Sequence, residues 1–277
     1  MGLFDYFKPV STMTAEEVRD FLRNRSADSL NLVDVRQPHE YEAGHLPGAV
    51  LMPLAEIPNR LGELDRSRPT ITYCGAGVRS RAAASILEEA GFSPVSSMSG
   101  GINAWNGLVA EGGYEEGLVY FSRASGAEEL ISLSWALEEG NRAFYERLSA
   151  DAGEGAAASL FRSLVRAEEN HKATLAELHA RVTRKAGPLA PPEGIAAGDF
   201  LEDGSRVDST LARVRGKSIR GALDILISVE ANAMDRYVKM GRAVSDADSR
   251  KVFLTLAEEE RAHLQKLSDL LERMPPG

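Results

Sequence analysis

The only cysteine of the 277-residue chain lies in a glycine-containing stretch between a predicted strand and a predicted helix. Residues 70–73 are β-branched and aromatic, as in a buried strand, and residues 81–90 have a helical composition. The turn at 75–80 can direct unpaired backbone N–H groups at Cys74, and Arg79 adds a positive charge. Such surroundings lower the pKa of a thiol and keep a thiolate ready to attack. The stretch therefore predicts a reactive cysteine rather than a small buried apolar residue.

Four glutamates and two histidines in the second half of the chain recur at matching spacings. Two glutamates are each followed three residues later by a histidine, and a further glutamate lies thirty residues before each of these pairs. All six fall on apolar stripes of predicted helices, where burying an unpartnered carboxylate is costly. Oxygen-rich ligands with two imidazoles suit a pair of iron or manganese ions. The predicted ligand set is Glu138, Glu168, His171, Glu230, Glu260 and His263.

Several polar residues lie next to these ligands in the sequence. We expect Glu139, Glu169 and Glu259 to be exposed charges beside the ligands, because a single glutamate on a helix usually faces solvent. Tyr145 and Tyr237 each follow a glutamate of the set by seven residues, so they either fill the core or contact the site, and we favour the core.

The elements that position these residues divide the chain into two predicted domains. Short strands alternate with helices over residues 1–111 and predict a parallel α/β sheet, whose ligands bind at the carboxyl ends of its strands. Residues 112–126 are predicted to be a linker, and residues 127–277 an all-α four-helix bundle with a long crossover. The four predicted helices span 127–150, 156–185, 218–243 and 246–274.

Length and composition exclude some classes of function. The length suggests two domains, and the net charge of -9 argues against a nucleic-acid partner, which needs a basic face. The sequence contains no apolar run of about 18 residues, so we expect no membrane span. One cysteine permits no internal disulfide and the start of the chain is not a secretory signal, so we expect a cytoplasmic protein.

Three stretches of the first domain resemble the rhodanese family. The first is 34–36 together with Glu40 and 44–49, the second is 74–80, and the third is 100–102 with Trp105. Their order and spacing, rather than any one of them, make the resemblance specific. It implies a rhodanese-like parallel sheet and a sulfurtransferase that takes sulfur from a small donor such as thiosulfate or a persulfide.

The resemblance also implies a role for each residue of the cysteine loop. Cys74 would accept a sulfane sulfur as a persulfide, and Arg79 would help to hold the anionic product. Asp34 and Arg36 would brace the loop rather than do chemistry. The implied persulfide-binding turn consists of Gly75, Ala76, Gly77, Val78 and Ser80. A redox-sensing thiol would use the same lowered pKa, and that alternative stays open.

The second domain resembles the ferritin-like di-iron proteins, and the rubrerythrin branch in particular, through its two Glu-x-x-His pairs and two further glutamates. The resemblance implies two iron ions, or manganese or a mixed pair, bridged by Glu168 and Glu260. Rubrerythrins usually add a four-cysteine iron centre that this chain cannot build. Electrons would therefore come from an external donor or from the sulfur on Cys74. A homodimer is expected by analogy alone.

Three functions remain in competition at this point. The first is a sulfurtransferase joined to a di-iron oxidase or peroxidase that acts on peroxide, O₂ or reduced sulfur. The second is an iron-binding or redox-sensing protein in which neither site turns over rapidly. The third is a scaffold whose helical bundle serves mainly for dimerisation. Metal content and sulfur-transfer assays would separate them.

Overall fold

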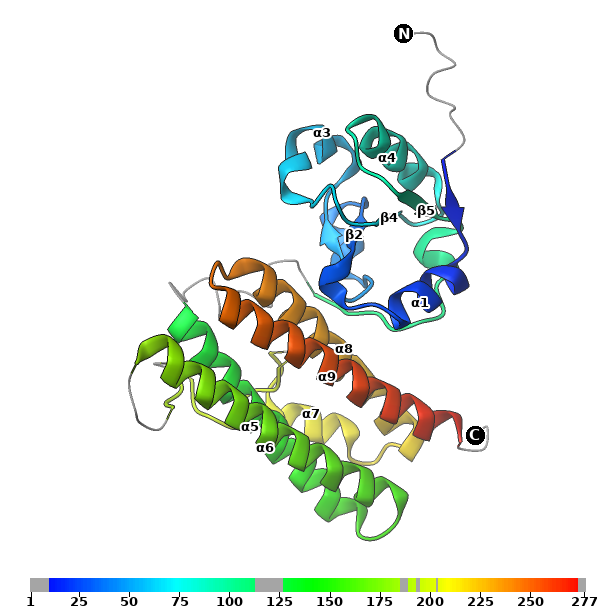
Figure 1. Ribbon diagram of the computed structural model, residues 1–277. Coiled ribbons are helices and arrows are strands. Elements are labelled where there is room, and N and C mark those ends of the chain that lie inside the picture. Colours follow the sequence, from blue (N-terminus) through cyan, green and yellow to red (C-terminus); the bar gives the residue numbers. More distant parts are fainter. Residues whose placement is uncertain (1–9, 113–126, 185–188, 193–194, 203, 274–277) are drawn as a thin grey trace. The chain divides into compact units, whose positions relative to one another are not determined.

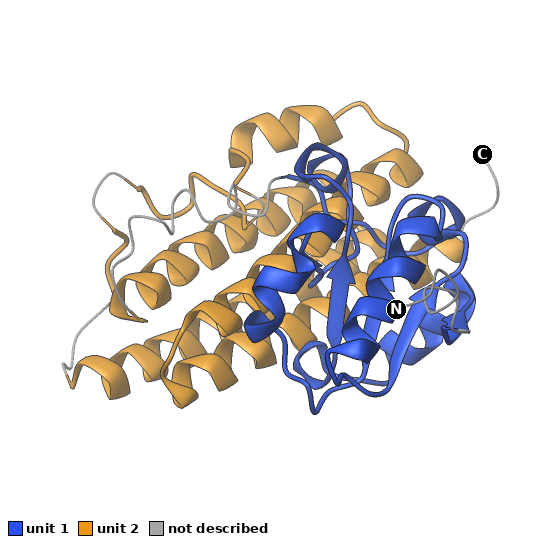
Figure 2. Ribbon diagram, turned by 90° about the horizontal axis from the view of Figure 1, so that it is seen from above, with its two compact units in different colours: residues 1–114 blue, residues 115–277 orange. Residues whose placement is uncertain are grey.

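The computed structural model describes residues 10–112, 127–184, 189–192, 195–202 and 204–273. The pattern of internal contacts divides the chain into two compact units, Met1–Tyr114 and Glu115–Gly277, which are coloured separately in Figure 2. From residue 113 on, the predicted linker lies outside the described residues. Each unit is described by itself below.

The first unit contains a five-stranded parallel sheet with strand order β1-β5-β4-β2-β3. The parallel arrangement agrees with the alternation of strands and helices in the sequence. One strand was not predicted, the two-residue edge strand β1, whose Thr12 pairs with Ser97. The strands are β1 (Thr12–Met13), β2 (Asn31–Asp34), β3 (Val50–Leu51), β4 (Thr70–Tyr73) and β5 (Val95–Met98).

Helices cover both faces of this sheet, as Figure 1 shows, because successive residues of a buried strand point to opposite faces. Along β2, Leu32 belongs to an apolar cluster with Val18 of α1, whereas its neighbour Val33 belongs to another with Leu87 of α4. A capping box at Thr14 opens α1, as the sequence predicts. The helices are α1 (Ala15–Arg23), α2 (Pro38–Glu42), α3 (Ile57–Arg60) and α4 (Val78–Glu89).

The second unit consists, in its described residues, of four long helices and one short helix. Two hairpins form it, α5 against α6 and α8 against α9, and α6 also packs on α9. The long helices agree with the sequence prediction to within a few residues, but the crossover contains a short helix, α7, that was not predicted. The helices are α5 (Ala127–Ala152), α6 (Ala156–Thr183), α7 (Val207–Val214), α8 (Ile219–Ala243) and α9 (Ala247–Glu272).

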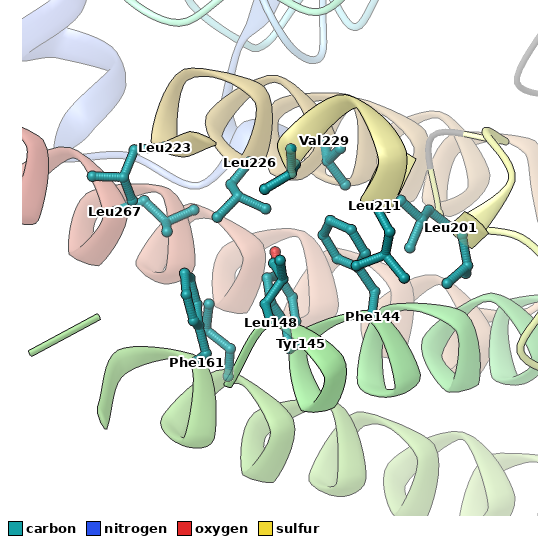
Figure 3. Close-up of a cluster of buried hydrophobic side chains, with 13 residues drawn as sticks. Phe144, Tyr145, Leu148, Phe161, Leu201, Leu211, Leu223, Leu226, Val229 and Leu267 are labelled. Carbon is teal, nitrogen blue, oxygen red and sulfur yellow. The ribbon is translucent and has the colours of Figure 1, made fainter. Parts of the chain in front are cut away.

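An apolar cluster joins all five helices of this unit (Figure 3). Leu148 of α5, Leu211 of α7 and Leu226 of α8 belong to it, together with Leu267 of α9. Burying such a side chain contributes about 1.5–3 kcal/mol, so the cluster holds the helices in register. Tyr145 also lies in this cluster, and its hydroxyl is the polar end of an otherwise apolar group (Figure 3).

Among the described residues, no helix combines the length and the apolar character that crossing a bilayer would require.

Candidate functional site

The cysteine loop of the first unit begins where β4 ends. The Sγ atom of Cys74 accepts a hydrogen bond from the backbone N–H of Gly77 at 3.1 Å. Helix α4 begins at Val78, earlier than residue 81 where the sequence places its start, so Arg79 and Ser80 lie in its first turn. The thiol is buried, and the backbone of the loop turns around it. The first turn of a helix carries unpaired N–H groups, which favour a thiolate at this position.

The pKa of the Cys74 thiol is lowered from its ordinary value. Burial raises this pKa, but the backbone N–H and hydroxyl of Ser80 and the backbone N–H groups of Gly77 and Ala76 outweigh burial. The sequence attributes the lowered pKa partly to the charge of Arg79. In the structure the hydrogen bonds of the loop are the main cause of the lowering.

Arg79 is held by a carboxylate from α2. Its two terminal nitrogens donate to the two carboxylate oxygens of Glu40, each at 2.7 Å. The hydrogen bond from Arg79 lowers the pKa of Glu40 to about 2, against a small opposing effect of burial. Arg79 also has its pKa raised, mainly by Glu40 and to a lesser degree by Cys74, which places its guanidinium between the two anions. Sequence reasoning missed the pair of Glu40 and Arg79 because the two residues are 39 positions apart and no motif or periodicity connects them.

Asp34 and Arg36 form a buried pair at the end of β2. The guanidinium of Arg36 donates to both carboxylate oxygens of Asp34, with a shortest distance of 2.6 Å, and to the carbonyl of Gly44 at 2.7 Å. Burial and then the charge of Asp34 raise the pKa of Tyr73, the residue before Cys74. The pair thus interacts with the strand that carries the cysteine, and its role as a brace of the loop stays a prediction.

The back of the cysteine loop rests on the turn after β5. The backbone N–H groups of Ile102 and Asn103 donate to the carbonyls of Cys74 and Gly75 at 2.8 and 3.1 Å. A Cβ atom on Gly101 would lie 2.2 Å from the Cys74 carbonyl oxygen, and Gly101 has a φ of +56°. Only glycine fits this close approach, which fixes the loop from behind and leaves its inner N–H groups for the sulfur.

A family model described as "Rhodanese-like domain" matches residues 14–108. The thiosulfate sulfurtransferase GlpE of Pseudoalteromonas translucida is 35% identical over 105 residues, which are 38% of this chain and 94% of GlpE. A sulfurtransferase of Allochromatium vinosum is 37% identical over 95 residues, covering 34% of this chain and 89% of that protein. Among solved structures, a rhodanese-like protein of Staphylococcus aureus has 29% identity and a TM-score of 0.33, covering 35% of this chain and 92% of its own.

Through its first unit, the chain belongs to the rhodanese-like family. The matched residues contain the whole cysteine loop and its bracing residues. The match ends at residue 108, before the described part of the helical unit begins.

In the helical unit, the six predicted ligands lie together on the inner faces of the four long helices, and all of them are buried. The Nδ1 atom of His171 lies 3.2 Å from Glu138, 3.3 Å from Glu168 and 3.1 Å from Glu260. The Nδ1 atom of His263 has the corresponding neighbours on the other side of the cluster. It lies 3.0 Å from Glu260, 3.4 Å from Glu230 and 3.9 Å from Glu168.

Two groups of ligand atoms, each within 4.8 Å of one another, could hold a cation. They share one carboxylate, that of Glu168. Both oxygens of Glu168 and one oxygen each of Glu230 and Glu260 are buried and accept no hydrogen bond among the described residues. A buried carboxylate oxygen without a donor is costly, so this donor set fits cations better than it fits a purely structural core. The groups are Glu138, Glu168, His171 and Glu260, and Glu168, Glu230 and His263.

Tyr145 and Tyr237 are buried core residues, as expected, and they also contact this site. The hydroxyl of Tyr145 on α5 donates to Glu230 on α8, and the hydroxyl of Tyr237 on α8 donates to Glu138 on α5. Each tyrosine therefore fixes the carboxylate of the opposite hairpin. The seven-residue spacing that marks both tyrosines in the sequence was the available signal.

The three neighbouring glutamates differ from one another. Glu259, expected to be a solvent-facing charge, contacts the Nε2 atom of His171 at 2.8 Å, although about half of its side chain is exposed. Glu259 is exposed as expected, but helix α9 also brings it into contact with the imidazole, which sequence reasoning missed. Glu139 pairs with Arg142 and Lys172 outside the cluster, and Glu169 is exposed as expected.

Sequence reasoning also missed Glu202, which lies in the crossover. This carboxylate is buried and accepts a hydrogen bond from the side-chain amide of Asn141 at 2.7 Å. Its backbone N–H donates back to the Asn141 side chain at 3.3 Å. No periodicity marks a residue in a crossover, so the sequence offers no signal for it.

The pKa values of the cluster are shifted in opposite directions by burial and mutual charge. Burial and then the charge of Glu138 raise the pKa of Glu168 well above its ordinary range, and burial with Glu260 raises that of Glu230 to about 8. Burial lowers the pKa of His263, but the charge of Glu260 and the hydrogen bonds to Glu230 and Glu260 together outweigh burial and raise this pKa to about 11. Because metal ligands must be deprotonated, binding of a cation to this cluster would depend on pH.

Proposed function

We propose that the first unit transfers sulfane sulfur through a persulfide on Cys74. The observation that carries this proposal is the ring of donors around Sγ, from Gly77 and Ser80, which stabilises an anion at that point. The sulfurtransferase relatives support the same reaction class. One of these relatives is a thiosulfate sulfurtransferase, so thiosulfate is the donor to test first.

The first half-reaction requires only groups that the loop provides. The Cys74 thiolate attacks the outer sulfur of thiosulfate, the S–S bond of the donor breaks, and sulfite leaves with the bonding electron pair. The outer sulfur of the new persulfide carries the negative charge that the thiolate lost. The N–H groups of residues 76–80 and the Arg79 guanidinium then face that charge.

The second half-reaction returns the enzyme to its starting state. A nucleophile such as a thiolate attacks the outer sulfur, and Cys74 leaves as a thiolate again. A low pKa of Cys74 helps here, because a stabilised thiolate is the better leaving group.

Mass spectrometry of the intact chain after incubation with thiosulfate tests this proposal. With one cysteine in the chain, the expected product gains the mass of one sulfur atom at Cys74 and loses it on addition of cyanide. An unmodified chain, or sulfur retained after Cys74→Ser, would contradict the proposal.

We further propose that the helical unit is a ferritin-like four-helix bundle that holds two iron or manganese ions. The observation that supports this is the convergence of four buried carboxylates and two imidazoles, with carboxylate oxygens left without donors. Glu168 and Glu260, each of which lies near both histidines, would help to hold both ions.

Bound iron or manganese would supply one-electron redox chemistry toward O₂, peroxide or reduced sulfur. The protein's own residues hold the charge and exclude water: the ligands are buried, and Tyr145 and Tyr237 orient the two carboxylates that come from α8 and α5. Four carboxylates balance two divalent cations, which removes the charge that makes this cluster costly in their absence.

Metal analysis of protein purified without chelators tests this second proposal, with two ions per chain as the expected result. Anaerobic loading with Fe(II), followed by repeated additions of peroxide, separates an oxidoreductase from a sensor. Repeated turnover with an external reductant favours an enzyme, whereas a single stoichiometric event favours the sensing alternative. Absence of metal in wild type and no binding on reconstitution would contradict the site altogether.

A further inference from the structure

The metal cluster has an internal two-fold relationship that can be read residue by residue. A shift of 92 positions carries Glu138 onto Glu230, Glu168 onto Glu260 and His171 onto His263. The same shift carries Tyr145 onto Tyr237, and the two tyrosine–glutamate hydrogen bonds correspond to each other. Two cations in such a cluster would have equivalent surroundings, unless other residues break the symmetry.

The two-fold relationship is first broken on α5, next to Glu138. Asn141 lies on α5 one turn from Glu138 and binds Glu202, but the position that corresponds to Asn141 in α8 is Ala233, which has no polar side chain. A Cβ atom on Gly140 would lie 1.8 Å from the backbone oxygen of Phe200, so the crossover segment is in direct contact with α5 here. The second half of the cluster has no counterpart of this segment among the described residues.

Glu202 faces the cluster from that segment. One of its carboxylate oxygens accepts from Asn141, and the other, Oε1, is buried and accepts no hydrogen bond among the described residues. Burial raises the pKa of Glu202, and the charges of Glu138, Glu260 and Glu168 raise it further. Glu202 is therefore a buried acidic group held by Asn141, one helical turn from Glu138, and the corresponding place in the second half has no such group among the described residues.

The second break lies behind His171. The Nε2 atom of His171 contacts Glu259 at 2.8 Å, and a carboxylate at this place makes the opposite nitrogen a better ligand. The position that corresponds to Glu259 is Ala167 on α6. Among the residues the structure describes, the carboxylates near His263 all lie at its Nδ1 atom.

Both breaks strengthen the same half of the cluster, and the geometry agrees. The group around His171 contains four ligand residues within the 4.8 Å limit, whereas the group around His263 contains three. We propose that the two cation positions are unequal: the position formed by Glu138, Glu168, His171 and Glu260 fills first, and Glu202 and Glu259 are the positioning residues that make it tighter. This inference rests on the proposed function of the helical unit as a two-cation site.

The expected size follows from what outer carboxylates contribute at other metal sites. Removing a partner of a ligating residue typically costs about 10–100-fold in metal affinity. Two such partners on one half and none on the other would separate the two binding constants by about 100-fold or more. A titration would then resolve two successive steps.

The experiment is a titration of the metal-free full-length protein with Co(II), followed by calorimetry and by the visible absorption of the bound ion. Wild type should bind two ions in two steps. Glu202→Gln and Glu259→Gln keep side-chain size and should each weaken the first step about 10-fold while changing the second by less than about 3-fold. Glu169→Gln, at an exposed position next to Glu168, is the matched control and should change neither step.

A gain-of-function variant tests the same inference in the opposite direction. Ala167→Glu places a carboxylate where His263 lacks one and should tighten the second step about 10-fold, which brings the two steps together. Circular dichroism and thermal unfolding of each metal-free variant show whether it is folded. Ala167→Glu adds a carboxylate at a half-buried position and removes no hydrogen bond, so its result does not depend on whether the fold tolerates such a loss.

The possible outcomes distinguish a failure of the proposed inequality from a failure of the proposed two-cation site. Binding of no Co(II), or of one ion only, by wild type would contradict the two-cation site itself. Binding of two ions with equal constants, or equal weakening of both steps in Glu202→Gln and Glu259→Gln, would overturn the inequality alone.

Discussion

The cysteine loop takes its donors from one continuous stretch of chain, whereas the proposed metal site takes its carboxylates and imidazoles from four separate helices. In the first site the important groups are the main-chain N–H groups of Ala76, Gly77 and Ser80, with the Ser80 hydroxyl. In the second they are side chains that only the packing of two hairpins brings together. One site therefore depends on local turn geometry, and the other on the tertiary core.

The difference extends to charge. The cysteine loop concentrates donors around one anion, and the cation in this loop, Arg79, is paired with Glu40. The cluster concentrates anions, and several of its carboxylate oxygens have no donor. A small anion thus suits the first site and cations suit the second, so each site should lose its function without affecting the other.

The largest expected effect is that of Cys74→Ser on sulfur transfer. Because no other sulfur nucleophile exists at the loop, transfer from thiosulfate to cyanide should fall by about 10³-fold or more. A colorimetric thiocyanate assay measures it. The metal content of the same variant should equal that of wild type. A joint loss of sulfur transfer and metal would show that the two sites are not independent.

The second largest effect is expected when carboxylates of the helical unit are changed and the cysteine loop is left intact. Glu168→Gln combined with Glu260→Gln removes both carboxylates that lie near both histidines, and metal affinity should fall by about 100-fold or more if each is a direct ligand, as proposed. Equilibrium dialysis measures the loss. Sulfur transfer by Cys74 should be unchanged, because its donors all come from the first unit.

Thermal unfolding provides a second readout of that variant. A ligand that binds only the folded state stabilises wild type by about 2.7 kcal/mol at 100 times its Kd. The metal-dependent rise in Tm should therefore be present in wild type and absent from the double variant. A rise of equal size in both would place the metal elsewhere.

The comparison also explains what the sequence could predict. The cysteine loop is contiguous, so its strand, turn and helix are visible in 70–90, although α4 begins earlier than expected. The six ligands are far apart, but 3.6-residue periodicity and an internal repeat place them on one axis. The first unit's parallel sheet follows from its alternating pattern, except for β1, which is too short to leave a signal.

What the sequence could not predict were contacts made only by tertiary packing. Glu40 reaches Arg79 across 39 residues, and Glu202 reaches Asn141 from an aperiodic crossover. Glu259 has the pattern of an exposed charge, and its contact with His171 exists only because α9 packs against α6. Helix α7 was missed because it is short and lies within a stretch rich in proline and glycine.

A smaller effect, that of Ser80→Ala, tests whether hydrogen bonds rather than the charge of Arg79 lower the pKa of Cys74. Ser80→Ala removes one of the main donors, so this pKa should rise by about one unit and transfer at pH 7 should fall about 10-fold. Thiolate absorbance, corrected with Cys74→Ser, gives the pKa directly. The rates of variant and wild type should converge as the pH rises above both pKa values.

Ser97→Ala is the matched control for that change. The Ser97 hydroxyl donates to Ser80 at 2.8 Å and leaves the Ser80 hydrogen free to point at the sulfur. Removing it keeps the direct donor, so the pKa of Cys74 should rise less than in Ser80→Ala. An equal or larger rise would show that the pKa of Cys74 depends on the buried pair of hydroxyls, Ser80 and Ser97, and not on the single donor at Ser80.

The smallest expected effect is on stability at acidic pH and comes from Glu40→Gln. The pKa of Glu40 is lowered to about 2 in the folded protein, so its pair with Arg79 stabilises the fold above the ordinary glutamate pKa of 4.5 and is lost as the pH falls toward 2. Both side chains are partly exposed, at 37% for Arg79 and 27% for Glu40, so the difference should be at most about 1 kcal/mol. Urea denaturation should show wild type more stable at pH 7, with the two curves converging between pH 5 and 2. A difference that grows on acidification would mean that Glu40 acts through something other than its charge, and Arg79 would then have to be counted as a free cation beside the sulfur.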